Sequence, residues 1–297
     1  MNRIIHYTIE HDCTSLASYL KERGYSAYIL TRLRQNDTLT LINNVPSYLI
    51  SPLHKGDMVS IGILEENTKD KLIPADIPLD ILYEDEDIIA INKPSHMPVH
   101  PSLGHYDNTL ANALMHYYRN QDSPFVFRAI NRLDRDTSGI VLVAKNLLSA
   151  SILGEEMKNN RISKTYLAIV CGTPFPPEGT IDKPIGRVSD SCIARCVDET
   201  NGAHAITKYR TLKTIGDKSL VELKLLTGRT HQIRVHMAYI GNPLIGDFLY
   251  NPDNKDMNRQ ALHSVATKMT HPITGKPMLI EAPMPSDMLA ICENYRE

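Results

Sequence analysis

A short run of charged and small residues at 131–139 is the part of this sequence best suited to chemistry. It reads Asn-Arg-Leu-Asp-Arg-Asp-Thr-Ser-Gly and directly precedes the apolar run 140–144, which is typical of a buried strand. Loops that a rigid strand holds in place often carry catalytic groups. Arg132 and Arg135 flank Asp134, and a neighbouring guanidinium lowers the pKa of a carboxyl group, which then stays an ionised nucleophile at neutral pH. The pattern predicts a catalytic aspartate at position 134.

Three other interpretations of the same segment compete with this one. A type I turn explains Asp136 and Gly139 but leaves Asp134 and its arginines unexplained. A calcium loop of the EF-hand kind needs a glutamate where Lys145 stands. A serine nucleophile at Ser138 lacks the Gly-x-Ser-x-Gly motif. From the residues alone, the turn and the catalytic aspartate stay about equally favoured.

Residues 1–75 are predicted to form a small separate unit, and residues 76–297 a larger domain. The elements expected in the first unit are a helix capped by Thr14 or Ser15 and ended by Gly24, a helix at about 27–34, a hairpin that turns at Asn43-Asn44 and a strand at 58–64. Charged residues with two prolines at 65–78 have the composition of a linker.

The larger domain is expected to contain longer strands separated by loops. Apolar runs predict strands at 88–91, 140–144, 166–170 and 220–226, and helices are expected at 147–157, capped by Asn146, and after Thr230 as a cap. Strands and helices alternate irregularly, without regular βαβ units. This order predicts an α+β fold with a large, mostly antiparallel mixed sheet and flanking helices.

Composition limits the class of protein without naming it. The 297 residues are 42% hydrophobic and 22% charged, with no apolar run of about 18 residues and no signal peptide pattern, so a cytoplasmic protein is expected. The five cysteines are odd in number and irregularly spaced, which favours free thiols. The net charge of −2 argues against a generally basic nucleic-acid binder, so any RNA affinity must come from local positive charge. Without a visible exposed apolar stripe, a monomer is expected.

Further motifs flank the 131–139 segment in a fixed order. They are Asn92-Lys93-Pro94, His100-Pro101-Ser102, Lys164-Thr165-Tyr166-Leu167-Ala168, the run 226–236, Gly246-Asp247 and 259–263. Together with Arg132-Leu133-Asp134 and Thr137-Ser138-Gly139 they resemble the RluA/RluD-type family of pseudouridine synthases, from about residue 80 to about 285. Asn131 departs from the usual histidine of that family, and His96 from a frequent glycine.

The resemblance implies an enzyme that isomerises specific uridines in structured RNA to pseudouridine. It implies Asp134 as the catalytic nucleophile, Arg234 as its partner and Tyr166 as the ring that stacks on the target base. Because the reaction is an isomerisation without redox change, no cofactor and no metal are expected. His231 and His236 are five residues apart, which does not suit two metal ligands on one helix face.

The same resemblance implies residues that bind the RNA. The substrate-binding candidates are Arg132, Arg135, Lys164, Arg229 and His231. Residues 1–75 look like a divergent form of the small RNA-binding module of a ribosomal small-subunit protein. The substrate expected is large-subunit ribosomal RNA or transfer RNA.

Two other functions compete with the enzyme. One is a non-catalytic RNA-binding protein built on the same fold. The other is a hydrolase that uses Asp134 and Asp136 as acid and base, which the flanking arginines disfavour because they keep both groups ionised.

Overall fold

The computed structural model describes residues 2–65, 72–120, 125–189, 191 and 193–293 of the chain. The predicted linker 65–78 therefore falls partly, at 66–71, outside the described residues, as does Cys192. The other four cysteines are free thiols. Across the described ranges, no helix has both the length and the apolar character that a membrane crossing needs.

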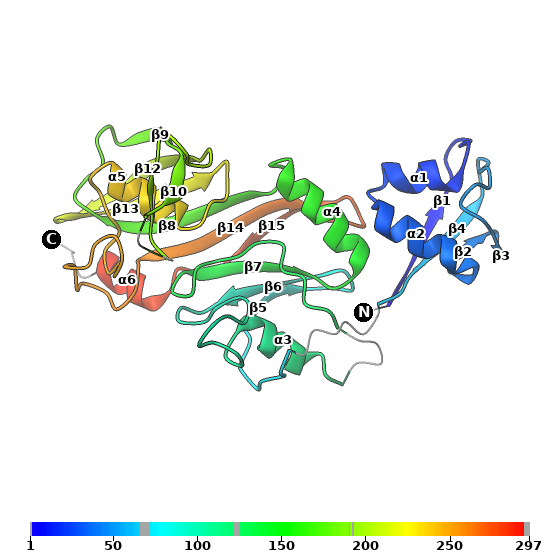
Figure 1. The fold of residues 1–297 in the computed structure, drawn as a ribbon, viewed down its shortest axis with the longest axis horizontal. Coiled ribbons are helices and arrows are strands. Elements are labelled where there is room, and N and C mark those ends of the chain that lie inside the picture. The colour runs from blue at the N-terminus through cyan, green and yellow to red at the C-terminus, as the bar shows by residue number, and fades with distance from the viewer. Residues whose placement is uncertain (1, 66–71, 121–124, 190, 192, 294–297) are drawn as a thin grey trace.

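The N-terminal part has a four-stranded antiparallel sheet of its own (Figure 1). Its elements are β1 (Arg3–Thr8), α1 (Leu16–Glu22), α2 (Ala27–Gln35), the 3-10 turn η1 (Asp37–Leu39), β2 (Thr40–Ile42), β3 (Val45–Pro46) and β4 (Met58–Ile63). Ser15 caps α1, as predicted. Asn43 and Asn44 both have positive φ, as the tight turn of the β2–β3 hairpin requires. Strand β1 was not predicted, because its apolar residues do not alternate with polar ones. Ile4 is exposed, whereas Arg3 lies on the same side of the strand as the buried Ile5.

A nine-stranded mixed sheet dominates the rest of the described chain (Figure 1). Its strands lie in the order β5 (Ile81–Glu84), β6 (Ile88–Lys93), β7 (Ser138–Ala144), β14 (Leu262–Thr270), β8 (Ser163–Cys171), β13 (Lys218–Leu225), β12 (Ile206–Ile215) and β9 (Glu178–Asp182), with β15 (Pro277–Glu281) paired to β14. Among the described strands, β7 and β14 alone pair in parallel. The predicted α+β fold with a mostly antiparallel sheet is confirmed.

The helices of this part and one small hairpin lie around the sheet. They are α3 (Leu110–Tyr117), α4 (Leu147–Lys158), α5 (Gln232–Tyr239) and α6 (Ser286–Glu293), with the hairpin of β10 (Ile185–Arg187) and β11 (Arg195–Val197). Asn146 caps α4, as predicted. The prediction that Thr230 caps α5 is wrong: His231 occupies the cap position in a left-handed conformation, without a side-chain cap.

Both faces of the central strands are buried, which explains their continuous apolar sequences. Successive residues of β6 and β7 point to opposite faces. Ile89 and Val141 belong to the core on one face, whereas Ile88 and Ile140 belong to the core on the other face, with Leu153 of α4.

The N-terminal part contacts α4, which lies beside it in Figure 1, and the β5–β6 turn, where Arg3 pairs with Asp87. Leu148 of α4 belongs to the same apolar core as Leu16 and Leu20 of α1. Ser151 Oγ of α4 donates a hydrogen bond of 3.0 Å to the Gly24 carbonyl. The division into domains at 1–75 and 76–297 stays a prediction.

Gly139, the last residue of the 131–139 segment, lets β7 lie close to β14. Its φ is +108°, and a Cβ at this position would lie 2.3 Å from the Ser264 carbonyl oxygen. No other residue fits without moving one of the two strands. The close parallel pairing at this point therefore fixes where the segment 131–138 enters the sheet.

We expect Gly139→Ala to destabilise the protein by roughly 2–4 kcal/mol, because overpacking and left-handed strain each cost about 1–3 kcal/mol. Gly154→Ala is the control: Gly154 lies inside α4 with no atom within 4 Å of the added Cβ, and the change should stabilise by about 0.5–1 kcal/mol. Urea unfolding of both variants measures the difference. Equal effects of the two substitutions would contradict the steric role of Gly139.

Candidate active site

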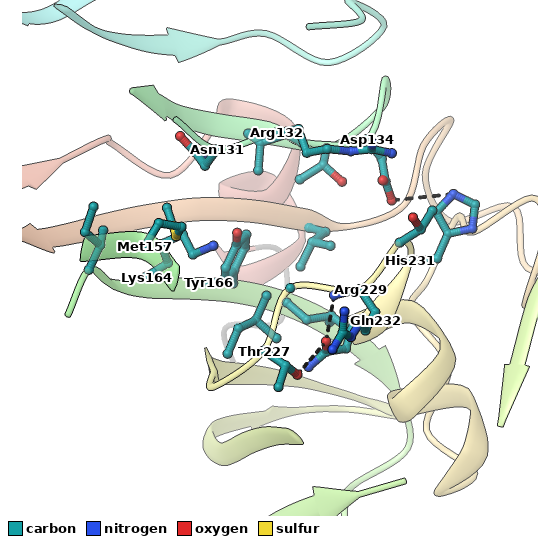
Figure 2. A pocket seen from close by; sticks show the side chains of 18 of the residues that line it. Asn131, Arg132, Asp134, Met157, Lys164, Tyr166, Thr227, Arg229, His231 and Gln232 are labelled. Atoms are coloured by element: carbon teal, nitrogen blue, oxygen red, sulfur yellow. Dashed lines mark hydrogen bonds and ion pairs between the residues drawn. The ribbon is translucent and has the colours of Figure 1, made fainter. Parts of the chain in front are cut away.

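A cleft of about 440 Å³ lies where the 131–137 loop faces β8 and the start of α5 (Figure 2). Its volume falls in the range of ligand-binding clefts. The predicted site residues that line it are Arg132, Asp134, Lys164, Tyr166, Arg229, His231 and Arg234. Residues that are far apart in the sequence thus meet around one opening.

Asp134 forms an ion pair with Arg234, which comes from a position 100 residues later in the chain. Arg234 Nη1 donates to Asp134 Oδ2 at 3.2 Å. The Nε and Nη2 atoms of the same guanidinium donate to the two oxygens of Asp247 at 2.7 and 2.8 Å. Arg234 and Asp247 are fully buried, whereas 23% of the Asp134 side chain is exposed to the cleft. Asp134 is therefore the one member of this trio that can reach a ligand.

The Arg234 guanidinium stays charged although it is buried. Burial lowers the pKa of Arg234, but Asp247 and Asp134 raise it by a larger total amount. A permanent cation thus lies next to Asp134. Its hydrogen bond gives the Asp134 carboxylate a defined direction in the lining of the cleft.

The arginines next to Asp134 in sequence do not play the part that their spacing suggested. Arg135 donates two hydrogen bonds of 2.9 Å to Asp136 and is not among the residues that line the cleft. Arg132 lines the cleft, but the structure shows no bond from it to Asp134. The cation that holds Asp134 comes from α5, because the tertiary fold brings that helix under the loop.

Asp134 opens a tight turn over residues 134–137. The competing interpretation expected a turn two residues later, with Asp136 first and Gly139 last. The Thr137 N–H donates to the Asp134 carbonyl at 3.1 Å. The Asp136 side chain binds Arg135 and His96 and does not point into the cleft. The turn and the candidate catalytic aspartate are therefore compatible interpretations of the same segment.

Lys93 holds this turn through a hydrogen bond to its backbone. Its ammonium donates to the carbonyls of Pro94, Met97 and Arg135 at 2.7, 2.8 and 3.0 Å. Burial lowers the pKa of Lys93 to about 7, although Asp136 and Asp134 raise it. Three carbonyl acceptors use all three ammonium donors and so favour the protonated form. The Asn-Lys-Pro motif was noted in the sequence, but only the structure gives its lysine this role.

Tyr166 and Lys164 lie side by side on β8 and line the cleft (Figure 2). Burial raises the pKa of Tyr166, so its hydroxyl group keeps its proton. Burial lowers the pKa of Lys164. The cleft thus presents a flat aromatic ring and an amine on one wall, opposite Asp134.

Arg229 and His231 lie on the loop that leads into α5. The Arg229 side chain is held by a backbone contact, since its Nε donates to the His204 carbonyl at 2.9 Å. His231 Nε2 lies 3.9 Å from Asp134 Oδ2. Burial lowers the pKa of His231, as do Arg234 and Arg195, while Asp134 opposes the change.

Two residues that support this site, Asp247 and Tyr250, were not predicted from the sequence. Asp247 belongs to the Gly246-Asp247 motif, and its place in the order of family motifs was the one sign in the sequence that it lies near the site. Tyr250 hydrogen-bonds His231, and no pattern in the sequence pointed to it.

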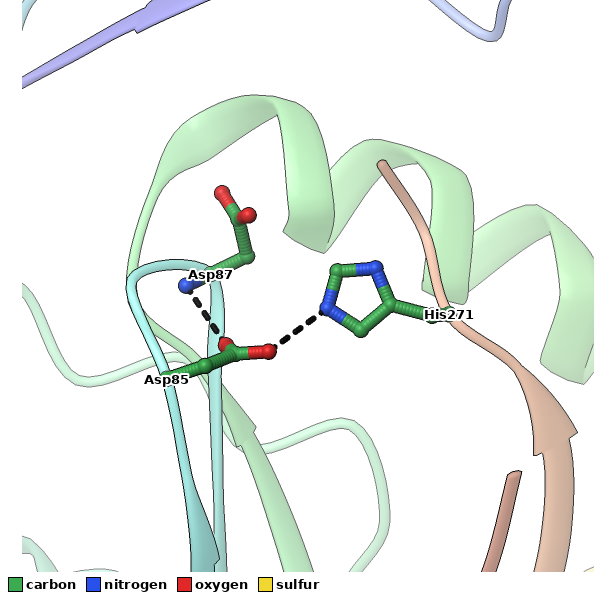
Figure 3. Close-up of side chains that lie close together, drawn as sticks. All are labelled: Asp85, Asp87 and His271. Atoms are coloured by element: carbon green, nitrogen blue, oxygen red, sulfur yellow. Dashed lines mark hydrogen bonds and ion pairs between the residues drawn. The ribbon is translucent and has the colours of Figure 1, made fainter. Parts of the chain in front are cut away.

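Asp85, Asp87 and His271 form the one group of potential metal ligands found among the described residues (Figure 3). His271 Nδ1 accepts two backbone N–H groups of the turn that follows it, so its Nε2 carries the proton and donates to Asp85 at 2.8 Å. Arg3 and Asn146 donate to Asp87. Because protein donors occupy these ligand atoms, the group is better described as a brace between β1, the β5–β6 turn and the end of β14.

Residues 87–239 match the protein family described as RNA pseudouridylate synthase. Over 274 residues the chain is 39% identical to the Bacillus subtilis protein named uncharacterized RNA pseudouridine synthase YjbO. The aligned region makes up 92% of this chain and 96% of that protein. The chain belongs to this family. It is therefore an RNA pseudouridine synthase, and the catalytic interpretation is supported over the non-catalytic RNA-binding protein.

Other relatives of this RNA pseudouridine synthase agree in fold and family. The ribosomal large subunit pseudouridine synthase D of Vibrio cholerae is 42% identical over 240 residues, which are 75% of this chain and 72% of that protein. The solved structure of human RNA pseudouridylate synthase domain containing 1 superposes with a TM-score of 0.59 at 29% identity, over 70% of this chain and 84% of that chain.

We expect Asp247→Asn to lower kcat by about 10²-fold, because the amide keeps one acceptor oxygen and turns a donor toward the second guanidinium N–H. The shifted guanidinium would misplace Asp134, and small misplacements in a site cost about that much. RNA affinity should change little, since Asp247 is buried away from the surface. Single-turnover assays and RNA binding separate the two effects.

Asp217→Asn serves as the control, since Asp217 is an exposed aspartate that pairs with a lysine outside the cleft. Wild-type kcat in the Asp247→Asn enzyme would show that Asp247 is not needed to position Arg234.

Proposed function

We propose that Asp134 is the catalytic nucleophile of this pseudouridine synthase and that Arg234 and Tyr166 complete its active site. The observation that carries the proposal is the Asp134–Arg234–Asp247 ion network at the bottom of the cleft. It supplies a charged, directed carboxylate where a nucleotide can enter.

The reaction breaks one carbon–nitrogen bond and forms one carbon–carbon bond, and no atom is lost. The bond from ribose carbon 1′ to uracil nitrogen 1 breaks, and a bond from the same carbon to uracil carbon 5 forms. The hydrogen on carbon 5 leaves as a proton, and nitrogen 1 gains one. Asp134 is proposed to act at this sugar–base junction.

The target uridine has to leave its stack to reach Asp134, which costs a few kcal/mol and least in a loop or mismatch. Tyr166 is proposed to stack on the extruded base, as aromatic residues do with unstacked bases. Arg132, which is exposed at the edge of the cleft, is proposed to occupy the vacated space or to hold neighbouring phosphates. Lys164 and Arg229 add positive charge to the same opening.

The substrate proposed is large-subunit ribosomal RNA. The relative from Vibrio cholerae carries that substrate in its name, and it aligns with 75% of this chain. The N-terminal part, with its own sheet and the basic helix α2, is proposed to bind the RNA outside the target site. Transfer RNA is the second candidate. A cytoplasmic location, a monomeric state and independence of cofactors and metals stay predictions.

We expect Asp134→Asn to lower activity by about 10⁴-fold or more, as loss of a nucleophile does in other enzymes, while RNA affinity is kept. Release of tritium from RNA labelled at uracil carbon 5 measures the activity. Asp76→Asn is the matched control, because Asp76 is 90% exposed and lies outside the cleft. Activity of Asp134→Asn near that of wild type would overturn the assignment.

We expect cells that lack this gene to lose pseudouridine at specific positions of large-subunit ribosomal RNA. Mapping of pseudouridines with and without the gene, and after complementation with wild type or Asp134→Asn, identifies those positions. If losses occur only in transfer RNA, the substrate proposal is wrong, although the enzyme class stands.

A further inference from the structure

His231 is the second polar side chain that faces Asp134, and it has an unusual backbone. It lies at φ 59°, ψ 17°, a left-handed conformation that costs a residue with a side chain about 1–2 kcal/mol. Strain of this kind tends to persist where a side chain must point in one direction. Here the ring points from the start of α5 toward Asp134 (Figure 2).

The second ring nitrogen of His231 has a fixed partner in Tyr250. His231 Nδ1 lies 3.0 Å from the Tyr250 hydroxyl oxygen. That oxygen already accepts the backbone N–H of Arg195, on β11, at 2.9 Å. The Tyr250 hydroxyl proton is therefore free to point at His231.

The charges around the ring decide which nitrogen carries its proton. If Nδ1 donated to Tyr250, the lone pair on Nε2 would face the Asp134 carboxylate at 3.9 Å. If Tyr250 donates instead, Nε2 carries the proton and directs it at that carboxylate, which is favourable. Burial and the cations Arg234 and Arg195 oppose a second proton on the ring, against the pull of Asp134 and Asp247.

The distance from Nε2 to Asp134 leaves this N–H without a full hydrogen bond. At 3.9 Å the pair is beyond hydrogen-bonding range, so a substrate oxygen next to Asp134 can accept the proton of Nε2. Because Asp134 is proposed to act at the sugar–base junction, the oxygens within reach belong to that junction. The better acceptors among them are the uracil 2-carbonyl and the ribose 2′-hydroxyl, since the ribose ring oxygen accepts hydrogen bonds weakly.

We propose that Tyr250 is a positioning residue that holds neutral His231 with its Nε2–H directed at the sugar–base junction, where His231 donates a hydrogen bond to an oxygen of the target nucleotide. This assignment rests on the proposed role of Asp134. A donor at the uracil 2-carbonyl would stabilise the charge that develops as nitrogen 1 leaves ribose. A donor at the 2′-hydroxyl would contribute to the choice of RNA over DNA.

The tautomer can be measured on the full-length protein without any substrate. Nitrogen-15 NMR of histidine-labelled protein should show His231 neutral, with the proton on Nε2, at neutral pH. In Tyr250→Phe the proton should be shared between the two nitrogens. A proton on Nδ1 in the wild type, or a doubly protonated ring at neutral pH, would overturn the proposal, whatever the role of Asp134.

Two substitutions of His231 separate a donor from a backbone role. The amide nitrogen of His231→Gln can replace Nε2, whereas that of His231→Asn matches Nδ1 and cannot reach the junction. Asparagine tolerates the left-handed backbone better than glutamine. We expect both to lower kcat, His231→Asn by about 10²-fold and His231→Gln about tenfold less, in line with the loss of one directed donor. Equal losses, or a more active asparagine variant, would mean that His231 serves the backbone alone.

Tyr250→Phe should lower kcat about tenfold with little change in KM, since lost orientation of one group affects the chemical step. Tyr209→Phe is the matched control. It removes another tyrosine hydroxyl in a buried position, bonded to the Pro176 carbonyl outside the cleft, and should keep wild-type kcat. Equal losses in both variants would contradict a specific role for Tyr250.

RNA with one altered target nucleotide identifies the acceptor. If His231 donates to the uracil 2-carbonyl, 2-thiouridine at the target should slow wild type more than His231→Asn. If it donates to the ribose 2′-hydroxyl, 2′-deoxyuridine at the target should slow wild type more than His231→Asn. Should both alterations slow wild type and variant by the same factor, His231 makes no hydrogen bond to the substrate and the proposal fails. Asp134→Asn, tested with unaltered RNA, reports separately on the proposed function.

Discussion

The Arg234 guanidinium lies between two carboxylates, and the geometry of the cleft depends on this arrangement. A buried cation is costly unless it is fully paired, and removal of one partner leaves an uncompensated charge. Asp247 holds the guanidinium with two short hydrogen bonds, whereas Asp134 receives one longer bond. Asp134 is thus held in one orientation while part of its carboxylate stays available at the cleft.

Rigid elements around the turn at Asp134 restrict its motion. Lys93 ties three carbonyls together below it, and Gly139 allows β7 to lie against β14 directly after it. The turn is therefore held from both sides by groups that do not themselves enter the cleft. Catalytic side chains need this support, because small displacements reduce rates strongly.

Net charge is a poor guide to what this protein binds. The chain carries a net charge of −2, yet Arg132, Lys164 and Arg229 all line one cleft. Acidic residues elsewhere pair with cations and balance the total, as Asp87 does with Arg3 and Asp136 with Arg135. A polyanion responds to the local charge at the opening, since salt screens charges beyond about 10 Å.

The sequence by itself determined the α+β class, the central strands and the candidate catalytic residue, because apolar runs and ordered motifs are local properties of the chain. Asn146 capping α4 and the turn at Asn43-Asn44 were predictable for the same reason. Strand β1 was not, since one buried residue leaves no periodic pattern. Charge spacing near Asp134 pointed to its neighbours in the sequence, whereas the family resemblance implied Arg234. The tertiary structure shows why the spacing misled: Arg135 turns to Asp136, and α5 brings Arg234 from 100 residues away. Asp247 holds Arg234, and Tyr250 hydrogen-bonds His231, only in the folded chain. Such contacts depend on distance in space, so they produce no recognisable spacing of residues in the sequence.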